Sequence, residues 1–207
     1  MDLTYENKLA KEGYRLIGGC DEAGRGPLAG PVVAACAVFD FSSPWTIGEL
    51  SLVRDCKKLT AKQRVKLFSL IKERAVAVEI GVVSNKIIDK INILQASLLA
   101  MRQSVDKLAV KPDFVFVDGQ FSIPKLAVPQ TAIIGGDGLV FSVAAASIIA
   151  KVSRDWLLDE YDKKYPGYGL AQHKGYGTRL HLERLAALGP SPIHRMSFKP
   201  LSDKCKN

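Results

Sequence analysis

The chain of 207 residues is long enough for one sizeable domain or two small ones. Its composition, 47% hydrophobic and 24% charged, is that of an ordinary globular protein and excludes disorder or collagen-like repetition for most of the chain. The formal net charge of +8 suits a polyanionic partner, and it is uneven, because residues 1–50 carry 4 basic and 7 acidic side chains whereas residues 163–207 carry 9 and 2.

The four cysteines form no CxxC pair and have no metal-ligand spacing. Cys20 and Cys36 lie within apolar runs, so we expect core residues in a reducing compartment. The first residues lack a basic flank followed by an apolar core, and no stretch approaches the roughly 18 uninterrupted apolar residues of a membrane helix. We therefore expect a soluble, cytoplasmic protein.

The first half of the chain alternates between short apolar runs bounded by turn residues and apolar residues at helical spacing. The first pattern is typical of strands buried on both faces, and the second of amphipathic helices. Thr60 and Gln63 have the spacing of a capping box, which starts a helix. In chain order we expect a strand at residues 16–20, a strand at 32–39, a loop at 40–59, the helix from Thr60, a strand at 76–83 and a helix at 87–108.

The second half continues the alternation. The expected elements are a strand at residues 114–117, a strand at 131–134, a long helix at 141–161 and a last helix that Thr178 caps and Gly189 ends. Strands alternating with helices indicate an α/β fold, with a central sheet flanked by helices. We expect a main domain of residues 1–162 with a basic C-terminal region, 163–207, packed on it as a small helical appendage.

Three of the predicted strands run into an aspartate: Asp21, which Glu22 follows, Asp118 and Asp137. Sites in open α/β sheets lie outside the carboxyl ends of the strands, so four carboxylates converge if these strands are neighbours. Such a cluster repels itself or takes up protons unless divalent cations bind, and Mg²⁺ and Mn²⁺ prefer carboxylate oxygen. A two-ion site on a basic protein indicates phosphodiester chemistry. The alternative is that each aspartate merely ends a strand or starts a turn.

Gly24, Arg25 and Gly26 follow this first acidic pair closely. Glycines allow backbone N–H groups to approach a ligand, and an arginine can contact a phosphate. The alternative is a tight turn between two strands.

Four basic residues are further candidates for phosphate binding. Lys57 and Lys58 form a pair in a polar loop, where the alternative is simple solvation. Lys151 and Arg154 lie three residues apart on a predicted helix and can face a duplex, with a polar helix face as the alternative.

Tyrosines are interleaved with basic side chains near the C-terminus, a pattern that can stack on bases and hold phosphates. Tyr176 belongs to this group, although tyrosines also pack loops onto cores. We expect the three histidines, His173, His181 and His194, to be structural or to face phosphates rather than to bind metal.

The segment Gly19-Cys-Asp-Glu-Ala-Gly-Arg-Gly-Pro-Leu-Ala-Gly-Pro-Val33 closely resembles the signature of ribonuclease HII, the type 2 ribonuclease H of bacteria. The resemblance spans about residues 14–200. It departs from the usual pattern at Cys56, where serine is common, and at Gly135 or Gly136, where lysine is frequent. The other matching segments are Asp55–Leu59, Ile91–Ala96, Val117–Gly119, Gly136-Asp137, Ala144–Val152, Arg154-Asp155, His173–Tyr176, Arg195 and Ser197-Phe198.

The resemblance implies a ribonuclease H-like fold, with a central mixed sheet flanked by helices, and an endonuclease that cleaves the RNA strand of RNA–DNA hybrids. It also implies nicking on the 5′ side of single ribonucleotides in duplex DNA, leaving 3′-hydroxyl and 5′-phosphate ends. Such an enzyme removes misincorporated ribonucleotides and RNA primers. The implied partner is a hybrid or a ribonucleotide-containing duplex. The sequence itself shows no obligate protein partner, and nothing in it demands more than a monomer.

The same resemblance assigns roles to individual residues. The catalytic carboxylates that would bind two Mg²⁺ or Mn²⁺ ions are Asp21, Glu22, Asp118 and Asp137. The loop that reads the ribose 2′-hydroxyl would be Gly24, Arg25 and Gly26, and Tyr176 would stack at the ribose–deoxyribose junction. The 2′-hydroxyl is what distinguishes RNA from DNA at a given position.

Two other functions remain open from the sequence. The chain could be a non-catalytic nucleic-acid-binding module, although a pure binder gains nothing from clustered carboxylates near phosphates. It could also be another metal-dependent nuclease of the same fold, from which the loop at residues 24–26 and Tyr176 would distinguish it.

Overall fold

The computed structural model describes residues 2–42, 48–55 and 59–204. Its centre is a five-stranded sheet in the order β3-β2-β1-β4-β5. β1 is antiparallel to β2 and β2 to β3, whereas β1, β4 and β5 run parallel, so the sheet is mixed, as expected. The strands are β1 (Leu16–Ala23), β2 (Val32–Asp40), β3 (Ala77–Val83), β4 (Phe114–Asp118) and β5 (Gln130–Ile133).

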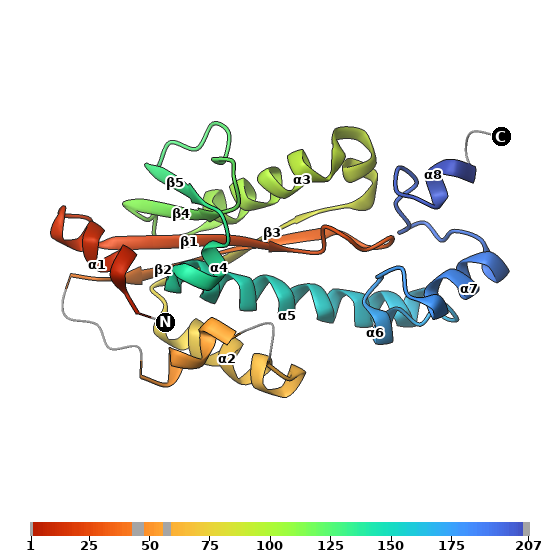
Figure 1. Ribbon diagram of the computed structural model, residues 1–207, viewed down its shortest axis with the longest axis horizontal. Helices are drawn as coiled ribbons and strands as arrows, with labels where there is room; N and C mark the ends of the chain where they lie inside the picture. Colours follow the sequence, from red (N-terminus) through yellow and green to blue (C-terminus); the bar gives the residue numbers. More distant parts are fainter. Residues whose placement is uncertain (1, 43–47, 56–58, 205–207) are drawn as a thin grey trace.

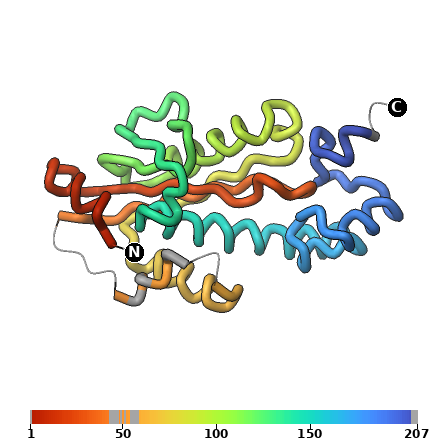
Figure 2. The backbone as a smooth tube through the Cα atoms, in the orientation of Figure 1, coloured from red at the N-terminus to blue at the C-terminus, as the bar shows by residue number. Residues whose placement is uncertain are grey.

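Helices cover both faces of this sheet. Figure 1 shows α3 on one face and the long α5 on the other, with α2 beyond α5. The short helices α6 to α8 gather at the end of the molecule away from the N-terminus, as the tube in Figure 2 shows. The helices are α1 (Thr4–Lys11), the 3-10 helix η1 (Gly48–Asp55), α2 (Ala61–Arg74), α3 (Asn85–Lys107), α4 (Gly136–Leu139), α5 (Phe141–Lys164), α6 (Leu170–His173), α7 (Arg179–Leu188) and α8 (Leu201–Lys204).

The predicted strands and longer helices are confirmed to within a few residues at their ends. The capping box is also present, since the Gln63 N–H donates to Thr60 Oγ1 and the Thr60 N–H donates to Gln63 Oε1 at 2.9 Å. The prediction of a loop at 40–59 is wrong for residues 48–55, which form η1, and α1 was not predicted. None of the described helices is long and apolar enough to cross a bilayer.

β2 explains how one sheet supports two apolar cores. Its side chains alternate, so Ala35, Ala37 and Phe39 join the core beneath α5, whereas Ala34 and Val38 join the core beneath α3. An apolar run without alternation is what a strand covered on both faces requires. Burying each large side chain contributes about 1.5–3 kcal/mol.

Gly19 lets α5 lie directly on β1. A Cβ atom at this position would lie only 2.1 Å from the backbone carbon of Ser142 in the first turn of α5. The same turn is held from the other side by buried Glu6, whose Oε1 accepts the Ser142 N–H at 2.9 Å. The start of α5 is therefore fixed against β1.

The C-terminal region pairs with the loop that follows β1. The Arg195 N–H donates to the Leu28 carbonyl at 2.8 Å, and the Gly30 N–H donates to the Ile193 carbonyl at 2.9 Å. Asn85, at the start of α3, donates its amide to the His194 carbonyl at 2.9 Å. Segments far apart in the chain thus lie side by side at this end of the sheet.

All three histidines are buried in this region, and two of them form a chain of hydrogen bonds. The Ser191 N–H donates to His194 Nδ1 at 2.9 Å, so the proton of this ring is on Nε2. His194 Nε2 then donates to His181 Nε2 at 3.1 Å, and His181 Nδ1 donates to the Tyr176 carbonyl at 2.9 Å. His173 stacks on His181 with ring centroids 4.2 Å apart. This series of hydrogen bonds requires the rings of His181 and His194 to be neutral, because each accepts a hydrogen bond at one nitrogen.

This requirement predicts a loss of stability in mild acid. Burial and the neighbouring His181 lower the pKa of His194 from 6.5 to about 4. The unfolded chain takes up a proton below about pH 6.5 and the folded protein does not until about pH 4, so stability falls with pH in this window. Between about pH 7 and about pH 5, the protonation of His194 in the unfolded chain lowers the free energy of unfolding by about 2 kcal/mol.

Urea unfolding of the wild type and of His194→Gln at both pH values measures this loss. The difference in unfolding free energy between the two proteins should shrink by about 2 kcal/mol at the lower pH, because glutamine does not titrate. A difference that is independent of pH would contradict the assignment.

Candidate active site

The parallel pairing of β1 with β4 brings the predicted carboxylates together. Cys20 is paired with Val117, and one residue further along the two strands come Asp21 and Asp118. Carboxylate oxygens of Asp21, Glu22 and Asp118 all lie within 4.8 Å of one another. Three converging carboxylates are a donor set that fits a hard divalent cation such as Mg²⁺ or Mn²⁺.

Asp21 is the most buried member of this cluster. Burial, followed by the charges of Glu22 and Asp118, raises the pKa of Asp21 well above its ordinary value. Two donors partly offset this effect: the Ser147 hydroxyl on α5 and the Glu22 N–H, which lies 2.7 Å from Asp21 Oδ1. The ionised cluster is therefore short of positive charge without a bound cation.

The sequence interpretation missed Ser147. It lies in an alanine-rich part of the predicted helix, where most side chains are small and nearly all are buried. Periodicity does not show which face of such a helix meets β1. In the folded protein β1 meets the start of α5 at Gly19, and Ser147 further along the helix donates to Asp21.

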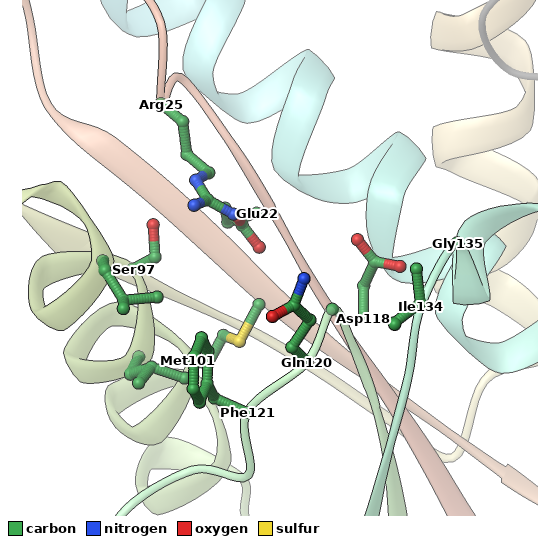
Figure 3. Close-up of a pocket in the computed structure, with 12 residues that line it drawn as sticks. Glu22, Arg25, Ser97, Met101, Asp118, Gln120, Phe121, Ile134 and Gly135 are labelled. Carbon is green, nitrogen blue, oxygen red and sulfur yellow. The ribbon is translucent and has the colours of Figure 1, made fainter.

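Glu22 has a different environment, because a cation already faces it. Burial raises the pKa of Glu22, and the guanidinium of Arg25 opposes this effect. Arg25 Nη1 donates to Glu22 Oε1 at 3.1 Å, and Figure 3 shows Arg25 reaching from the loop after β1 towards this carboxylate. Arg25 is thus paired with the site, although 53% of its side chain stays exposed to solvent.

Asp118 and Asp137 are connected through Gly136. The Gly136 N–H donates to Asp118 Oδ1 at 2.7 Å, which fixes the orientation of that carboxylate. Asp137 follows in the first turn of α4. It is not in the group of three carboxylates found among the described residues, so its role as a fourth ligand stays a prediction.

Two hollows open on either side of Glu22 and Arg25, which line both. The first, of about 390 Å³, lies between α3 and the segments after β4 and β5, and Figure 3 shows Asp118 and Gln120 opposite Met101 and Ser97. The second is about 420 Å³ in volume. Besides Glu22 and Arg25 it is lined by Ala23, Gly24, Gly26, Arg64, Ser147, Lys151, Arg154 and Tyr176.

The second hollow brings the predicted loop and tyrosine together. A Cβ atom on Gly26 would lie 3.8 Å from Cε1 of Tyr176, so the ring stands beside this glycine. Tyr176 is 45% exposed, so part of its side chain is accessible to a ligand. Arg64 on α2 also lines the hollow and was not predicted.

The expectation that Arg154 faces a duplex is wrong. Its side chain is 1% exposed, and its three nitrogens donate to the carbonyls of Pro31, Lys174 and Ala29 at 3.0–3.1 Å. A Cβ atom on Gly24 would lie 2.1 Å from Arg154 Nε. Gly24 is therefore required first of all to leave room for this buried arginine.

The other predicted basic residues have different outcomes. Lys151 lines the second hollow, half-buried, and its Nζ lies 2.6 Å from Asp155 Oδ1. A phosphate contact by Lys151 stays a prediction. Lys57 and Lys58 lie outside the described residues.

Removing the charge of Asp21 should stabilise the protein when no metal is bound. Because folding raises the pKa of Asp21, its ionised form opposes folding at neutral pH. Asp21→Asn keeps an oxygen for the Glu22 N–H, so it should raise both the free energy of unfolding and the Tm in chelator.

Thermal unfolding in chelator and in Mn²⁺ tests this prediction. The wild type should gain stability from Mn²⁺ by linkage, whereas Asp21→Asn should gain much less. A variant that melts below the wild type in chelator would show that the cluster is not strained.

Comparison with known proteins agrees with this arrangement. A family model described as Ribonuclease HII matches residues 18–201. The ribonuclease HII of Geobacter sulfurreducens is 54% identical over 195 residues, which cover 94% of this chain and 87% of that protein.

Solved structures show the same fold. The ribonuclease H2 of Pyrococcus horikoshii OT3 superposes with a TM-score of 0.74 at 30% identity, covering 91% of this chain and 96% of that one. Bst-RNase HIII, solved in complex with Mn²⁺, has a TM-score of 0.73 at 19% identity over 93% and 70% of the two chains, and it shows the fold alone. Because the family model and its relatives match nearly the whole chain, this protein belongs to the ribonuclease HII family and is a metal-dependent ribonuclease.

Proposed function

We propose that this chain cleaves the RNA strand of RNA–DNA hybrids and nicks duplex DNA on the 5′ side of single ribonucleotides, leaving 3′-hydroxyl and 5′-phosphate ends. Two divalent cations, Mg²⁺ or Mn²⁺, would be its cofactors. The proposed setting is the cytoplasm, and the proposed role is removal of misincorporated ribonucleotides and RNA primers by a monomer without an obligate protein partner.

One observation carries this proposal. Glu22 belongs to the carboxylate cluster and also lines the hollow at Gly24, Gly26 and Tyr176, and Arg25, which pairs with it, lines the same hollow. A nucleotide whose ribose lies against the loop therefore places its phosphate near the carboxylates. Recognition of a 2′-hydroxyl and hydrolysis of the adjoining phosphodiester require this proximity.

Some residues of the site would bind the cations, and others would orient the carboxylates. Asp21, Glu22, Asp118 and Asp137 would hold the cations, which when bound would supply an activated water and stabilise the leaving oxygen. The Ser147 hydroxyl and the Gly136 N–H keep two of these carboxylates aimed at the site. No protein nucleophile is needed.

Arg25 would change partner when substrate binds. In the free protein its guanidinium is paired with Glu22 at 3.1 Å. With Glu22 engaged by a cation, Arg25 would be available to pair with a phosphate through charge-assisted hydrogen bonds. The ion pair thus keeps Glu22 within the site before the cation arrives.

Asp118→Asn should abolish turnover while leaving the fold and duplex binding in place. Loss of a group that supports a metal ligand lowers metal affinity or activity about 10–100-fold, so loss of the ligand itself should lower activity more than about 100-fold. The measurement is nicking of a labelled DNA duplex that contains one ribonucleotide, with Mg²⁺, Mn²⁺ or chelator. Wild-type turnover in this variant would show that the site is misplaced.

The all-DNA duplex of the same sequence is the control for ribose recognition. Metal-dependent cleavage 5′ to the ribonucleotide with this control intact supports the proposal. Equal cleavage of both duplexes favours another nuclease of the same fold, and binding without cleavage under every metal favours a binding module.

Tyr176→Ala should impair cleavage at a single ribonucleotide more than cleavage of a long hybrid. Stacking on one base is worth about 1–3 kcal/mol, so a loss of about tenfold is expected where the junction must be sensed. Tyr176→Phe is the matched variant and should retain activity, because stacking uses the ring. Equal losses on both substrates would remove the role of Tyr176 as a junction sensor.

A further inference from the structure

Arg195 lies behind the loop at residues 24–26 and is fully buried. Its guanidinium donates to four backbone carbonyls: Gly24 at 2.6 Å, Arg25 at 2.9 Å, Gly30 at 3.0 Å and Pro31 at 3.2 Å. A buried cation gives up its hydration, and burial lowers the pKa of Arg195 to about 9. The loop carbonyls replace the lost water.

The hydrogen bonds to the Gly24 and Arg25 carbonyls fix the orientation of two consecutive peptide groups. A trans peptide is planar, and its C=O and N–H point in opposite directions. The Gly24 carbonyl belongs to the same peptide as the Arg25 N–H, and the Arg25 carbonyl belongs to the same peptide as the Gly26 N–H. Because both carbonyls face Arg195, both N–H groups face away from it.

The side away from Arg195 is the second hollow. Gly24, Arg25 and Gly26 line this hollow and Arg195 does not. Among the described residues, neither the Arg25 nor the Gly26 N–H donates to another protein group. Successive N–H groups turned to one side form a concave site for an anion or an oxygen acceptor.

We propose that Arg195 is a positioning residue for ribose recognition: its guanidinium sets the two peptide planes that present the Arg25 and Gly26 N–H groups to the 2′-oxygen and adjoining phosphate of a ribonucleotide. The inference rests on the proposed function and names a residue that acts through the loop without touching substrate. Lysine cannot replace it, because a single ammonium on a flexible stem cannot bond four carbonyls in a fixed fork.

The test measures discrimination by binding, so that turnover does not enter. In an Asp118→Asn parent, affinity is measured for a duplex with one ribonucleotide and for the matching all-DNA duplex. Arg195→Lys should lower the ratio of the two affinities by about 3- to 10-fold, since one or two neutral hydrogen bonds are misaligned. Affinity for the all-DNA duplex should change little, because the charge is kept.

Val105→Ala in the same parent is the control for general destabilisation. Val105 is buried in the core beneath α3 and lines neither hollow, so this variant should lose stability and keep the affinity ratio. If Arg195→Lys also leaves the ratio of the two affinities unchanged, Arg195 has no role in ribose recognition, and the proposed function is unaffected. A parent that does not discriminate between the duplexes would contradict the proposed function itself.

A second measurement covers the case in which Arg195→Lys does not fold. Amide NMR signals of Arg25 and Gly26 in the Asp118→Asn parent should shift on addition of the ribonucleotide duplex and shift less with the all-DNA duplex. If both duplexes leave these two amides unchanged, the N–H groups do not meet the substrate and the inference is wrong.

Discussion

Repulsion between the carboxylates of Asp21, Glu22 and Asp118 is the constraint that the rest of the molecule has to accommodate. Two of them stand at the ends of paired strands, and they cannot separate unless the ladder between β1 and β4 opens. Two apolar cores, one under α3 and one under α5, keep that ladder closed. The free energy that the metal-free cluster costs is regained when a cation binds, so a strained site is also one prepared for its cofactor.

Three arginines contact the loop of residues 24–31 or the carboxylates beside it. Arg25 is exposed and pairs with Glu22, whereas Arg154 and Arg195 are buried and donate to carbonyls of the loop. Part of the positive charge of the chain is therefore structural, and Arg195 of the C-terminal region belongs to this part. Net charge suggested a polyanionic partner, but the interior uses two of the arginines to hold the surface that such a partner would meet.

Much of the fold could be predicted because its signals are local. A strand buried on both faces, the capping box at Thr60 and an aspartate at the end of an apolar run each depend on a few neighbouring residues. The contacts across the fold could not be predicted in this way. Lys151 and Arg154 lie on one helix, three residues apart, yet one is paired at the rim of a hollow and the other is buried, because only Arg154 meets the space left by Gly24.

Gly24 shows why a glycine in a signature can be misread. From the sequence it indicates either close approach of a ligand or a tight turn, and the structure adds a third reason, because its φ of +99° and the contact with Arg154 exclude a side chain. Glycine usually makes a loop flexible. Here six hydrogen bonds from Arg154 and Arg195 to the carbonyls of residues 24–31 remove that freedom. A loop ordered before substrate arrives loses less entropy on binding, so the two buried arginines convert a flexible segment into a preorganised one.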